Sequence, residues 1–486
     1  MNLNSYRFFL FFFIIFILYY TVCKRRQQEL LLISSIFFIL CYSPFCFVLL
    51  LFVTVSAYGA SCLIVKKASY GKKYAIISTV LFLGILAVFK YLMFGVNMWN
   101  RMMTALTGSE NVVTPALQIM LPVGISFYIF QNIGYVWDVY KKRAPAEKSF
   151  AKYLLFISYF PKFTVGPIER AEGFMPQMQQ ETREFSYANA VAGLRIVMIG
   201  LFKKVAVADV LAPVVNNVFD NPAEYTGLSL MIATILYTFQ IYCDFSGYAD
   251  LAIGYSKMLG INLMQNFHSP YFSKSISGFW RRWHISLSSW FRDFVYIPLG
   301  GNRVGKMRHM FNTMVTFVLS GIWHGASLNF WAWGGVHGIL LCIENGLNKG
   351  RERHKKGLHR SGFAEAAKWG LTFVCISVAW VFFRANSLRG AVYIISHYFS
   401  QWQFNLSYVK ASIVSMGFTE LTCVVVLVSL GILVVIDWLQ CKRSISDVLG
   451  VQKPYIRWGI YFFFVFYILF CKMYMAQSQQ FIYFQF

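Results

Sequence analysis

Long apolar runs recur along the whole chain, and they restrict it to folds that are built in a lipid bilayer. One run extends from about residue 311 to residue 341, which is long enough to cross the hydrocarbon core. Only 13% of the 486 residues are charged, whereas soluble domains carry roughly 25%. Because every backbone polar group in lipid needs a partner within the chain, runs of this length predict helices. The sequence therefore predicts an all-α polytopic membrane protein.

The apolar runs differ in length, and this indicates that the helices do not form a bundle of straight spans. Residues 30–43 are too few to cross alone, and Pro44 then ends the helix. Short helices at membrane depth need protein or a cavity around them. We expect about 11 membrane helices plus re-entrant or interfacial helices around an indented centre. The runs lie near residues 6–22, 30–43, 46–65, 74–96, 116–138, 150–166, 188–219, 227–256, 311–343, 366–384, 417–439 and 456–475.

The basic residues indicate the orientation of the chain. They outnumber acidic residues by 44 to 20, and they cluster in short loops that positive-inside bias places in the cytoplasm. The loops on the other side would then include residues 97–115 and 397–415, and the tail 476–486 would be extracytoplasmic. The net charge of +24 favours contact with anionic lipid head groups rather than nucleic acid. The cytoplasmic clusters are Lys24–Arg26, Lys66–Lys73, Lys141–Arg143, Lys349–Arg360 and Lys442–Arg443.

The ten cysteines are dispersed along the chain, and most lie within or beside apolar runs. No Cys-x-x-Cys pair occurs, so the sequence predicts neither a metal site nor a disulfide framework. Buried and chemically inert thiols are the expected interpretation.

His324 lies within one of the longest apolar runs, and it is the main candidate for a functional residue. An ionisable group at membrane depth is costly, so it indicates a functional site. Imidazole can accept and return a proton near neutral pH. The alternative is a packed histidine that bonds a backbone carbonyl. His337 lies thirteen residues further, about 20 Å away on one continuous helix, and so outside the same site unless the helix breaks at Gly334-Gly335.

Residues 268–303 have a different pattern, in which Trp and Phe alternate with Arg and Ser. This pattern predicts an amphipathic, interfacial segment rather than a spanning helix. Ser275 or Ser277 could cap a helix within it.

Five blocks, in this order, resemble the membrane-bound O-acyltransferases, and within them the bacterial branch that O-acetylates alginate. The resemblance runs from about residue 5 to the end of the chain. A lone Trp-His-Gly would be a weak signal, whereas five ordered blocks are specific. The blocks are Phe160-Pro-Lys-Phe-Thr-Val-Gly-Pro-Ile-Glu-Arg170, Gln240-Ile-Tyr-Cys-Asp-Phe-Ser-Gly-Tyr-Ala-Asp-Leu-Ala-Ile-Gly254, Phe279-Trp-Arg-Arg-Trp-His-Ile-Ser-Leu-Ser288 with Tyr296-Ile-Pro-Leu-Gly-Gly-Asn-Arg303, Gly321-Ile-Trp-His-Gly-Ala326, and Phe481-Ile-Tyr-Phe-Gln-Phe486.

The resemblance implies one integral-membrane O-acyltransferase domain over residues 1–486, with its core motifs in residues 160–345. It implies helices around a central funnel or tunnel, in the cytoplasmic (inner) membrane of a bacterium. It also implies transfer of acetyl from cytoplasmic acetyl-CoA towards an extracytoplasmic polysaccharide or peptidoglycan. Acetyl-CoA would be a substrate, and no permanently bound cofactor is expected. Because the chain has no large outer domain that could grip a glycan, an extracytoplasmic partner of the SGNH esterase or acetyltransferase type is implied.

The resemblance also implies roles for the two histidines of the motifs. His324 matches the family's membrane histidine and would act as general base towards the attacking hydroxyl. His284 matches the second histidine and would orient substrate or lie near the donor. Its structural alternative is an anchor for an interfacial helix. Arg281 and Arg282 could pair with the phosphates of coenzyme A, since guanidinium binds phosphate through two bonds. Ordinary inside-positive anchoring is equally compatible with both arginines.

Two further features have both a structural and a functional interpretation. Asp244 and Asp250 lie in an otherwise apolar run, where a buried carboxylate needs a partner. Asp244 could fix the tautomer of a catalytic imidazole, or the two carboxylates could be purely structural. Tyr483 lies in the apolar tail. It could carry the acyl group as a phenolic ester, since a phenol leaves more readily than an alkyl alcohol, or the tail could only pack.

Two other functions remain as alternatives. One is D-alanyl transfer to teichoic acid from a carrier protein, the reaction of close relatives that tend to be shorter. The length of this chain and its own aromatic C-terminal motif favour acetyl without deciding between the two. The other is a transporter, which would require paired intramembrane charges and repeat symmetry that the chain does not display. The sequence names neither the glycan, the partner protein, the oligomeric state nor the source.

Overall fold

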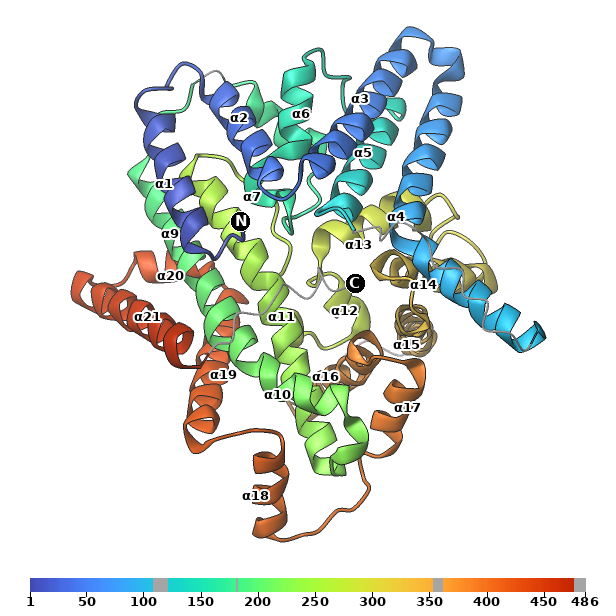
Figure 1. Ribbon diagram of the computed structural model, residues 1–486, viewed down its shortest axis with the longest axis vertical. Coiled ribbons are helices and arrows are strands. Elements are labelled where there is room, and N and C mark those ends of the chain that lie inside the picture. The colour runs from blue at the N-terminus through green and yellow to red at the C-terminus, as the bar shows by residue number, and fades with distance from the viewer. Residues whose placement is uncertain (108–120, 181, 353–361, 476–486) are drawn as a thin grey trace. The chain divides into compact units, whose positions relative to one another are not determined.

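The computed structural model describes residues 1–107, 121–180, 182–352 and 362–475, and most of these residues are helical (Figure 1). No β-strand occurs within these ranges, so the all-α prediction is confirmed. Six of the described helices are long and apolar enough to cross a membrane. The expected count of about 11 is therefore not confirmed. The six spans are Pro44–Lys66, Ala68–Thr107, Gly227–Met258, Gly362–Arg384, Glu420–Gln440 and Pro454–Tyr474.

The chain forms two compact units. The first contains Met1–Gly193 and Leu251–Met264, and the second contains Leu194–Asp250 and the chain from Gln265 onwards. Two of the boundaries fall inside α9 (Tyr187–Leu201) and α11 (Gly227–Met258), and the third falls in the non-helical connection after Met264. This division does not test the expectation of one domain over residues 1–486.

In the first unit, α3 packs against α2, α4 and α5, and α2 also contacts α6 and α7. Pro44 begins α3 instead of merely ending α2, because proline is tolerated in the first turn and the Ser43 side chain caps the helix. The helix from residue 71 continues to Thr107, so residues 97–107, expected in a loop, are helical. The helices of this unit are α1 (Tyr6–Tyr20), α2 (Gln27–Leu40), α3 (Pro44–Lys66), α4 (Gly71–Thr107), α5 (Ile125–Tyr140), α6 (Phe150–Ser158), α7 (Phe160–Phe163), α8 (Ala171–Met178) and the start of α9 up to Gly193.

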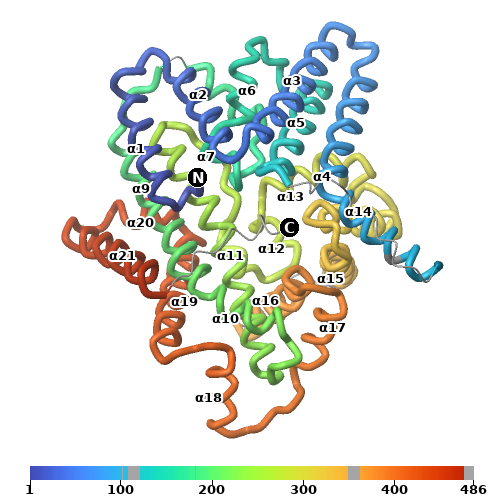
Figure 2. The backbone as a smooth tube through the Cα atoms, in the orientation of Figure 1, coloured from blue at the N-terminus to red at the C-terminus, as the bar shows by residue number. Residues whose placement is uncertain are grey.

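In the second unit, α14 and α15 form an antiparallel pair, and α15 packs against α12, α16 and α17. Figure 2 follows this pair as two adjacent tubes. Helices α19 and α21 pack against a π-helical stretch, Phe202–Ala208, that joins α9 to α10. The helices are α10 (Asp209–Asp220), α11, α12 (Ile276–Trp280), α13 (Ile285–Phe291), α14 (Lys306–His324), α15 (Leu328–Glu352), α16 (Gly362–Arg384), α17 (Leu388–Ser396), α18 (Leu406–Ser415), α19 (Glu420–Gln440), α20 (Ile445–Gly450) and α21 (Pro454–Tyr474).

The segment 268–303 consists of short pieces and not of one amphipathic helix. Ser275 caps α12 by accepting a hydrogen bond from the Gly278 amide, as predicted. The segment does not span a membrane, but it is more buried than an interfacial helix would be. Phe279 and Trp283 are each only 1% exposed because they pack against α11 and α16 through Tyr242 and Trp380.

Candidate active site

His324 is the last residue of α14, and the chain turns there into α15. The expected single helix over residues 311–343 is therefore wrong. The break occurs at residues 325–327 and not at Gly334-Gly335. Ser327 begins the second helix, since its carbonyl accepts from the Phe330 amide and its hydroxyl from the Asn329 amide. The turn places His324 at a helix end, where its side chain can project into a site.

Glycines allow α14 and α15 to approach closely below this turn. A Cβ atom on Gly321 would lie 2.1 Å from the Phe330 carbonyl oxygen, and one on Gly334 would lie 2.3 Å from the Phe317 oxygen. Small residues at such contacts let helix backbones meet in an apolar environment. The pair is therefore a tight support for the histidine at its end.

His324 is 4% exposed and is surrounded by aromatic rings. Its ring centroid lies 4.9 Å from that of Trp323, 5.0 Å from that of Trp333 and 5.2 Å from that of Phe383. These rings come from α14, α15 and α16. They exclude most water from the imidazole and hold its plane in one orientation.

His284 is 1% exposed and lies between α12 and α13. Its backbone φ is +44°, a left-handed conformation that is unfavourable for a residue with a side chain. Its Nδ1 atom lies 3.2 Å from the Asn266 Oδ1 atom, and its ring contacts that of Phe245 at 4.6 Å. Burial lowers the pKa of His284 to about 3, so the imidazole is neutral at physiological pH.

The ring of Trp323 contacts both candidate histidines. Its ring centroid is 4.9 Å from His324 and 6.2 Å from His284. His337, expected to lie outside the site, is also near. Trp333 contacts His324 at 5.0 Å and His337 at 4.9 Å. The hairpin explains this, because His337 lies on the second helix beside the first.

A pocket of about 340 Å³ opens beside α12 and α13 and follows α14 towards His324. Its lining on α14 runs from His309 to Ser320, and Ser320 is one helical turn before His324. Arg281 also lines the pocket, whereas Arg282 is not among its lining residues. Arg292 is a second lining guanidinium, although it pairs with Asp293 at 2.9 Å. The pocket thus combines two guanidinium groups with a wall of α14 that consists of hydroxyl-bearing side chains, His309 and Phe317.

Glu344 of α15 holds the N-terminus of α12, a helix that lines the pocket. Its carboxylate accepts hydrogen bonds from the backbone amides of Ile276 and Ser277, at 2.6 and 3.2 Å. These are the first amides of α12, which lack partners inside the helix. Glu344 therefore ties α12, with the lining residue Trp280 at its end, to α15.

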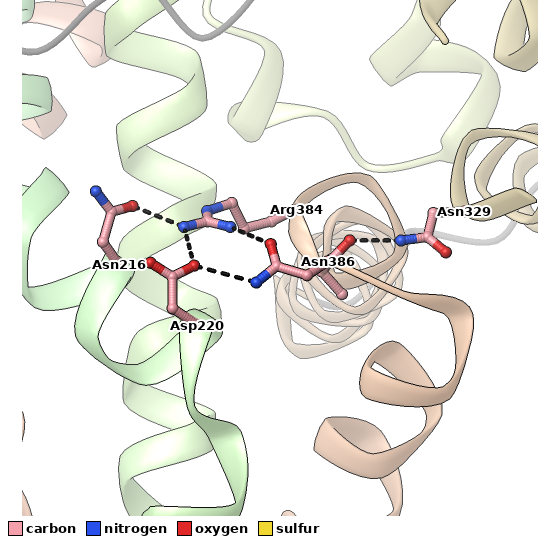
Figure 3. A network of polar contacts seen from close by, with 6 residues as sticks. Asn216, Asp220, Asn329, Arg384 and Asn386 are labelled. Carbon is pink, nitrogen blue, oxygen red and sulfur yellow. Dashed lines mark hydrogen bonds and ion pairs between the residues drawn. The ribbon is translucent and has the colours of Figure 1, made fainter. Parts of the chain in front are cut away.

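A polar network fixes the end of α16 next to the aromatic ring that contacts His324 (Figure 3). Arg384 donates to Asn216 at 2.8 Å and to Asp220 at 3.1 Å, both on α10. Asn329, at the start of α15, donates to the Ala385 carbonyl. Because Phe383 directly precedes this network, its ring has little freedom to move away from the imidazole.

Asp244 and Asp250 lie on α11, a candidate membrane span, and pair with lysines of the π-helical stretch. Lys204 bonds Asp244 and Asp209, each at 2.7 Å, and Lys203 bonds Asp250 at 2.8 Å. The wider π-helical turn presents two consecutive lysines to α11, and such stretches often mark functional sites. These contacts favour the structural role for Asp244. They give no support to a role in fixing an imidazole.

The block from Phe160 to Arg170, within the first unit, contains two buried ionisable residues, Lys162 and Glu169. Lys162 is 3% exposed, and its Nζ atom lies over the rings of Phe156 and Phe174 at 4.6 and 5.0 Å. Glu169 accepts from the Met264 amide at 2.6 Å. Burial lowers the pKa of Lys162 and raises the pKa of Glu169, because it disfavours both charged forms.

Several of these residues could not be selected from the sequence. Asn266, Lys203, Lys204 and Glu344 carry no motif spacing of their own, and their roles depend on partners distant in the chain. The two lysines lie inside an apolar run, and this was the one available signal. Tyr483 lies outside the described residues.

An all-helical membrane fold, with a buried histidine at the end of a glycine-packed hairpin, is consistent with the resemblance found in the motifs. The chain belongs to the membrane-bound O-acyltransferase family, whose model matches residues 142–383. The protein is therefore an O-acyltransferase that crosses the membrane several times.

Three relatives indicate the range of acyl transfer in this part of the family. The chain is 37% identical to a probable alginate O-acetylase AlgI of Pseudomonas putida, over 76% of this chain and 73% of the relative. It is 34% identical to a peptidoglycan O-acetyltransferase of Helicobacter pylori, over 67% of this chain and 64% of the relative. It is 28% identical to a teichoic acid D-alanyltransferase of Streptococcus thermophilus, over 54% of this chain and 68% of the relative.

Proposed function

We propose that the chain takes acetyl from cytoplasmic acetyl-CoA and passes it across the bacterial cytoplasmic membrane, for O-acetylation of an extracytoplasmic polysaccharide or peptidoglycan. The observation that carries this proposal is the pocket that leads along α14 to one turn before His324. Two O-acetylating relatives at 34–37% identity support acetyl as the transferred group.

The pocket is the proposed site of the acyl donor. Its two lining arginines, Arg281 and Arg292, suit the phosphates of coenzyme A. From His309 to His324 is about 22 Å along α14, which matches an extended pantetheine arm with its thioester at the far end. The apolar lining residues, Phe317 among them, suit the arm and not the phosphates.

His324 is the proposed general base. A hydroxyl is a weak nucleophile until a base takes its proton, and the imidazole can accept that proton as the oxygen attacks the thioester carbonyl. The C–O bond forms and the C–S bond breaks. The proton then passes from the imidazolium to the departing sulfur, which leaves as coenzyme A thiol. His284, whose ring also contacts Trp323, is proposed to orient the reacting groups.

The test is thiol release from acetyl-CoA by purified protein in lipid nanodiscs, with a hydroxyl acceptor. His324→Gln should lower kcat by at least about 100-fold with full insertion of the protein, since a positioned base contributes this much. The matched control is His397→Gln, because His397 is a half-buried histidine that bonds only its own helix and the adjacent Ser396 in the described contacts. Full activity of His324→Gln would refute the base assignment.

The second candidate is D-alanyl transfer from a carrier protein, which the 28% identical relative favours. Both donors would present a phosphopantetheine thioester, so the pocket alone suits either. Thiol release from acetyl-CoA, but not from a D-alanyl carrier protein, would support acetyl transfer. The reverse would replace the proposal with the alternative. An extracytoplasmic SGNH-type partner, co-purified by a tag on this chain, would support delivery to a glycan.

A further inference from the structure

Asn266 is completely buried and lies beside the second histidine of the site. Its Oδ1 atom is 3.2 Å from the His284 Nδ1 atom, 3.2 Å from the Ser286 amide nitrogen and 3.0 Å from the Ser286 hydroxyl. Its backbone carbonyl accepts from the Ile285 amide at 2.9 Å. One residue therefore contacts the chain at His284 and at the two positions that follow it.

The orientation of the Asn266 amide follows from the Ser286 contact. A backbone N–H can only donate, so it must meet an oxygen and not the NH₂ group of the amide. If the amide were rotated by 180°, its NH₂ group would face another donor. The oxygen is therefore fixed on the side that also faces the imidazole.

The tautomer of His284 follows in turn. An amide oxygen can only accept, so the His284 Nδ1 atom must carry the proton that lies between them. Because burial keeps the ring neutral, with a pKa lowered to about 3, the Nε2 atom is then the acceptor. The other tautomer would place the Nδ1 lone pair against the lone pairs of the amide oxygen.

The backbone strain at His284 gives this arrangement a second support. A left-handed φ is unfavourable at a residue with a side chain and persists only where surrounding contacts enforce it. The bonds from Asn266 to residues 285 and 286, together with the bond from the His268 amide to the Arg282 carbonyl at 3.0 Å, enforce it here. The strained residue is thus fixed from both sides by one short segment.

We propose that Asn266 is a positioning residue that holds the His284 imidazole in the Nδ1–H tautomer and so makes Nε2 the proton-accepting atom presented to the reacting groups. This inference rests on the proposed function for the role of His284 in acyl transfer. The tautomer itself does not, since it is a property of the resting protein. The rings of Phe245 on α11, Phe267, and Trp323 on α14 also contact the imidazole, and none of these three side chains is charged.

The first test determines the tautomer of His284 directly, without measuring catalysis. Full-length protein with ¹⁵N-labelled histidine is studied by solid-state NMR in lipid, and His284→Gln identifies the two signals of this ring. A protonated Nδ1 with an unprotonated Nε2 is expected at pH 7. A protonated Nε2 in the wild-type protein would overturn the proposal, whatever the activity.

The second test separates positioning from packing. Asn266→Asp keeps an oxygen acceptor for both donors, so kcat should stay within about threefold of wild type. Asn266→Leu has a similar size but no acceptor, so kcat should fall at least about 30-fold with KM changed less than threefold. Ser286→Ala is the matched control, since it removes one donor from the same oxygen without touching the ring, and it should stay near wild type. Equal losses in the Asp and Leu variants would contradict positioning.

The Asp variant also gives a pH signature. A carboxylate beside Nδ1 favours the imidazolium, so the acid limb of kcat/KM should move to higher pH by about one unit or more. If the acid limb of the pH profile of kcat/KM does not move, this result would contradict a contact between residue 266 and the imidazole that acts in catalysis. If the NMR result holds but His284→Gln is fully active, the tautomer stands and the proposed role of His284 in transfer fails.

Discussion

At the scale of single residues, Trp323 connects the motif that contains His284 with the motif that contains His324. It contacts His324 as a chain neighbour and reaches the ring of His284 across the turn between α12 and α13. The indole therefore links the residue that ends α14 to the residue that precedes α13, so two motifs that are distant in the sequence contribute to one buried aromatic cluster.

Substitution of Lys204 can separate an effect on the stability of the protein from an effect on catalysis. Lys204→Met would leave the buried carboxylates of Asp209 and Asp244 without their shared cation, so stability should fall by about 3–5 kcal/mol. Thermal unfolding in detergent measures the loss. The triple variant with Asp209→Asn and Asp244→Asn should recover most of it, since it removes the charges together.

The same series decides between the two roles of Asp244. If the carboxylate is structural, the triple variant should release thiol from acetyl-CoA at close to the wild-type rate. A stable triple variant with activity lowered at least about 100-fold would instead return Asp244 to the site as a residue that orients an imidazole.

His284 should make the protein less stable in acid. Its folded pKa of about 3 lies below the ordinary value of about 6.5, so between these pH values the unfolded chain binds a proton that the folded chain does not. Stability therefore falls as pH decreases below about 6.5. At pH 5 this one residue should cost about 2 kcal/mol relative to pH 7.

The measurement compares wild type with His284→Gln by thermal unfolding at pH 7 and pH 5. The variant should lose less stability on acidification, because glutamine binds no proton. Equal losses in the two proteins would show that the folded imidazole is not protected from protonation.

At the scale of elements, the hairpin of α14 and α15 determines where His324 lies. Gly321→Ala would place a methyl group 2.1 Å from the Phe330 carbonyl oxygen, so the helices must separate. We expect a loss of about 2 kcal/mol or more, as for overpacked cores, and reduced kcat from a displaced histidine.

The control for this variant lies in the same hairpin. Gly335→Ala meets no atom within 4 Å, and it should be neutral or stabilising by up to about 1 kcal/mol, because alanine favours helix. Thermal unfolding and thiol release are measured for both. Similar behaviour of the two variants would contradict the close approach at Gly321.

The sequence was sufficient for some of these elements and not for others. Pro44 and Ser275 act through local chemistry, so a helix start and a cap could be predicted from them. The break after His324 was not predicted, because residues 311–343 form one apolar run, although Ser327 is a residue type that begins helices. The partners of Asp244, and the role of Asn266, depend on contacts between distant segments. The hydrophobic periodicity of the sequence carries no information about such contacts.

At the scale of the whole molecule, the described residues outside the helices are mostly short connections. In the proposed reaction the acetyl group leaves on a hydroxyl, which belongs either to a partner or to this chain. The charge pattern predicts an extracytoplasmic tail at residues 476–486, so Tyr483 is the candidate acceptor within the chain.

Tyr483→Phe tests this last step, because it removes one hydroxyl and keeps the ring. If the tyrosine carries acetyl as a phenolic ester, polysaccharide or peptidoglycan O-acetylation in cells should fall at least about tenfold, since the relay then has no oxygen to accept the group. If the tail only packs, phenylalanine packs equally well and acetylation should not change. Tyr474→Phe, at the exposed end of α21, is the matched control. Acetyl ester content of the isolated glycan is the measurement, and wild-type content in the Tyr483→Phe strain would leave a partner's hydroxyl as the direct acceptor at His324.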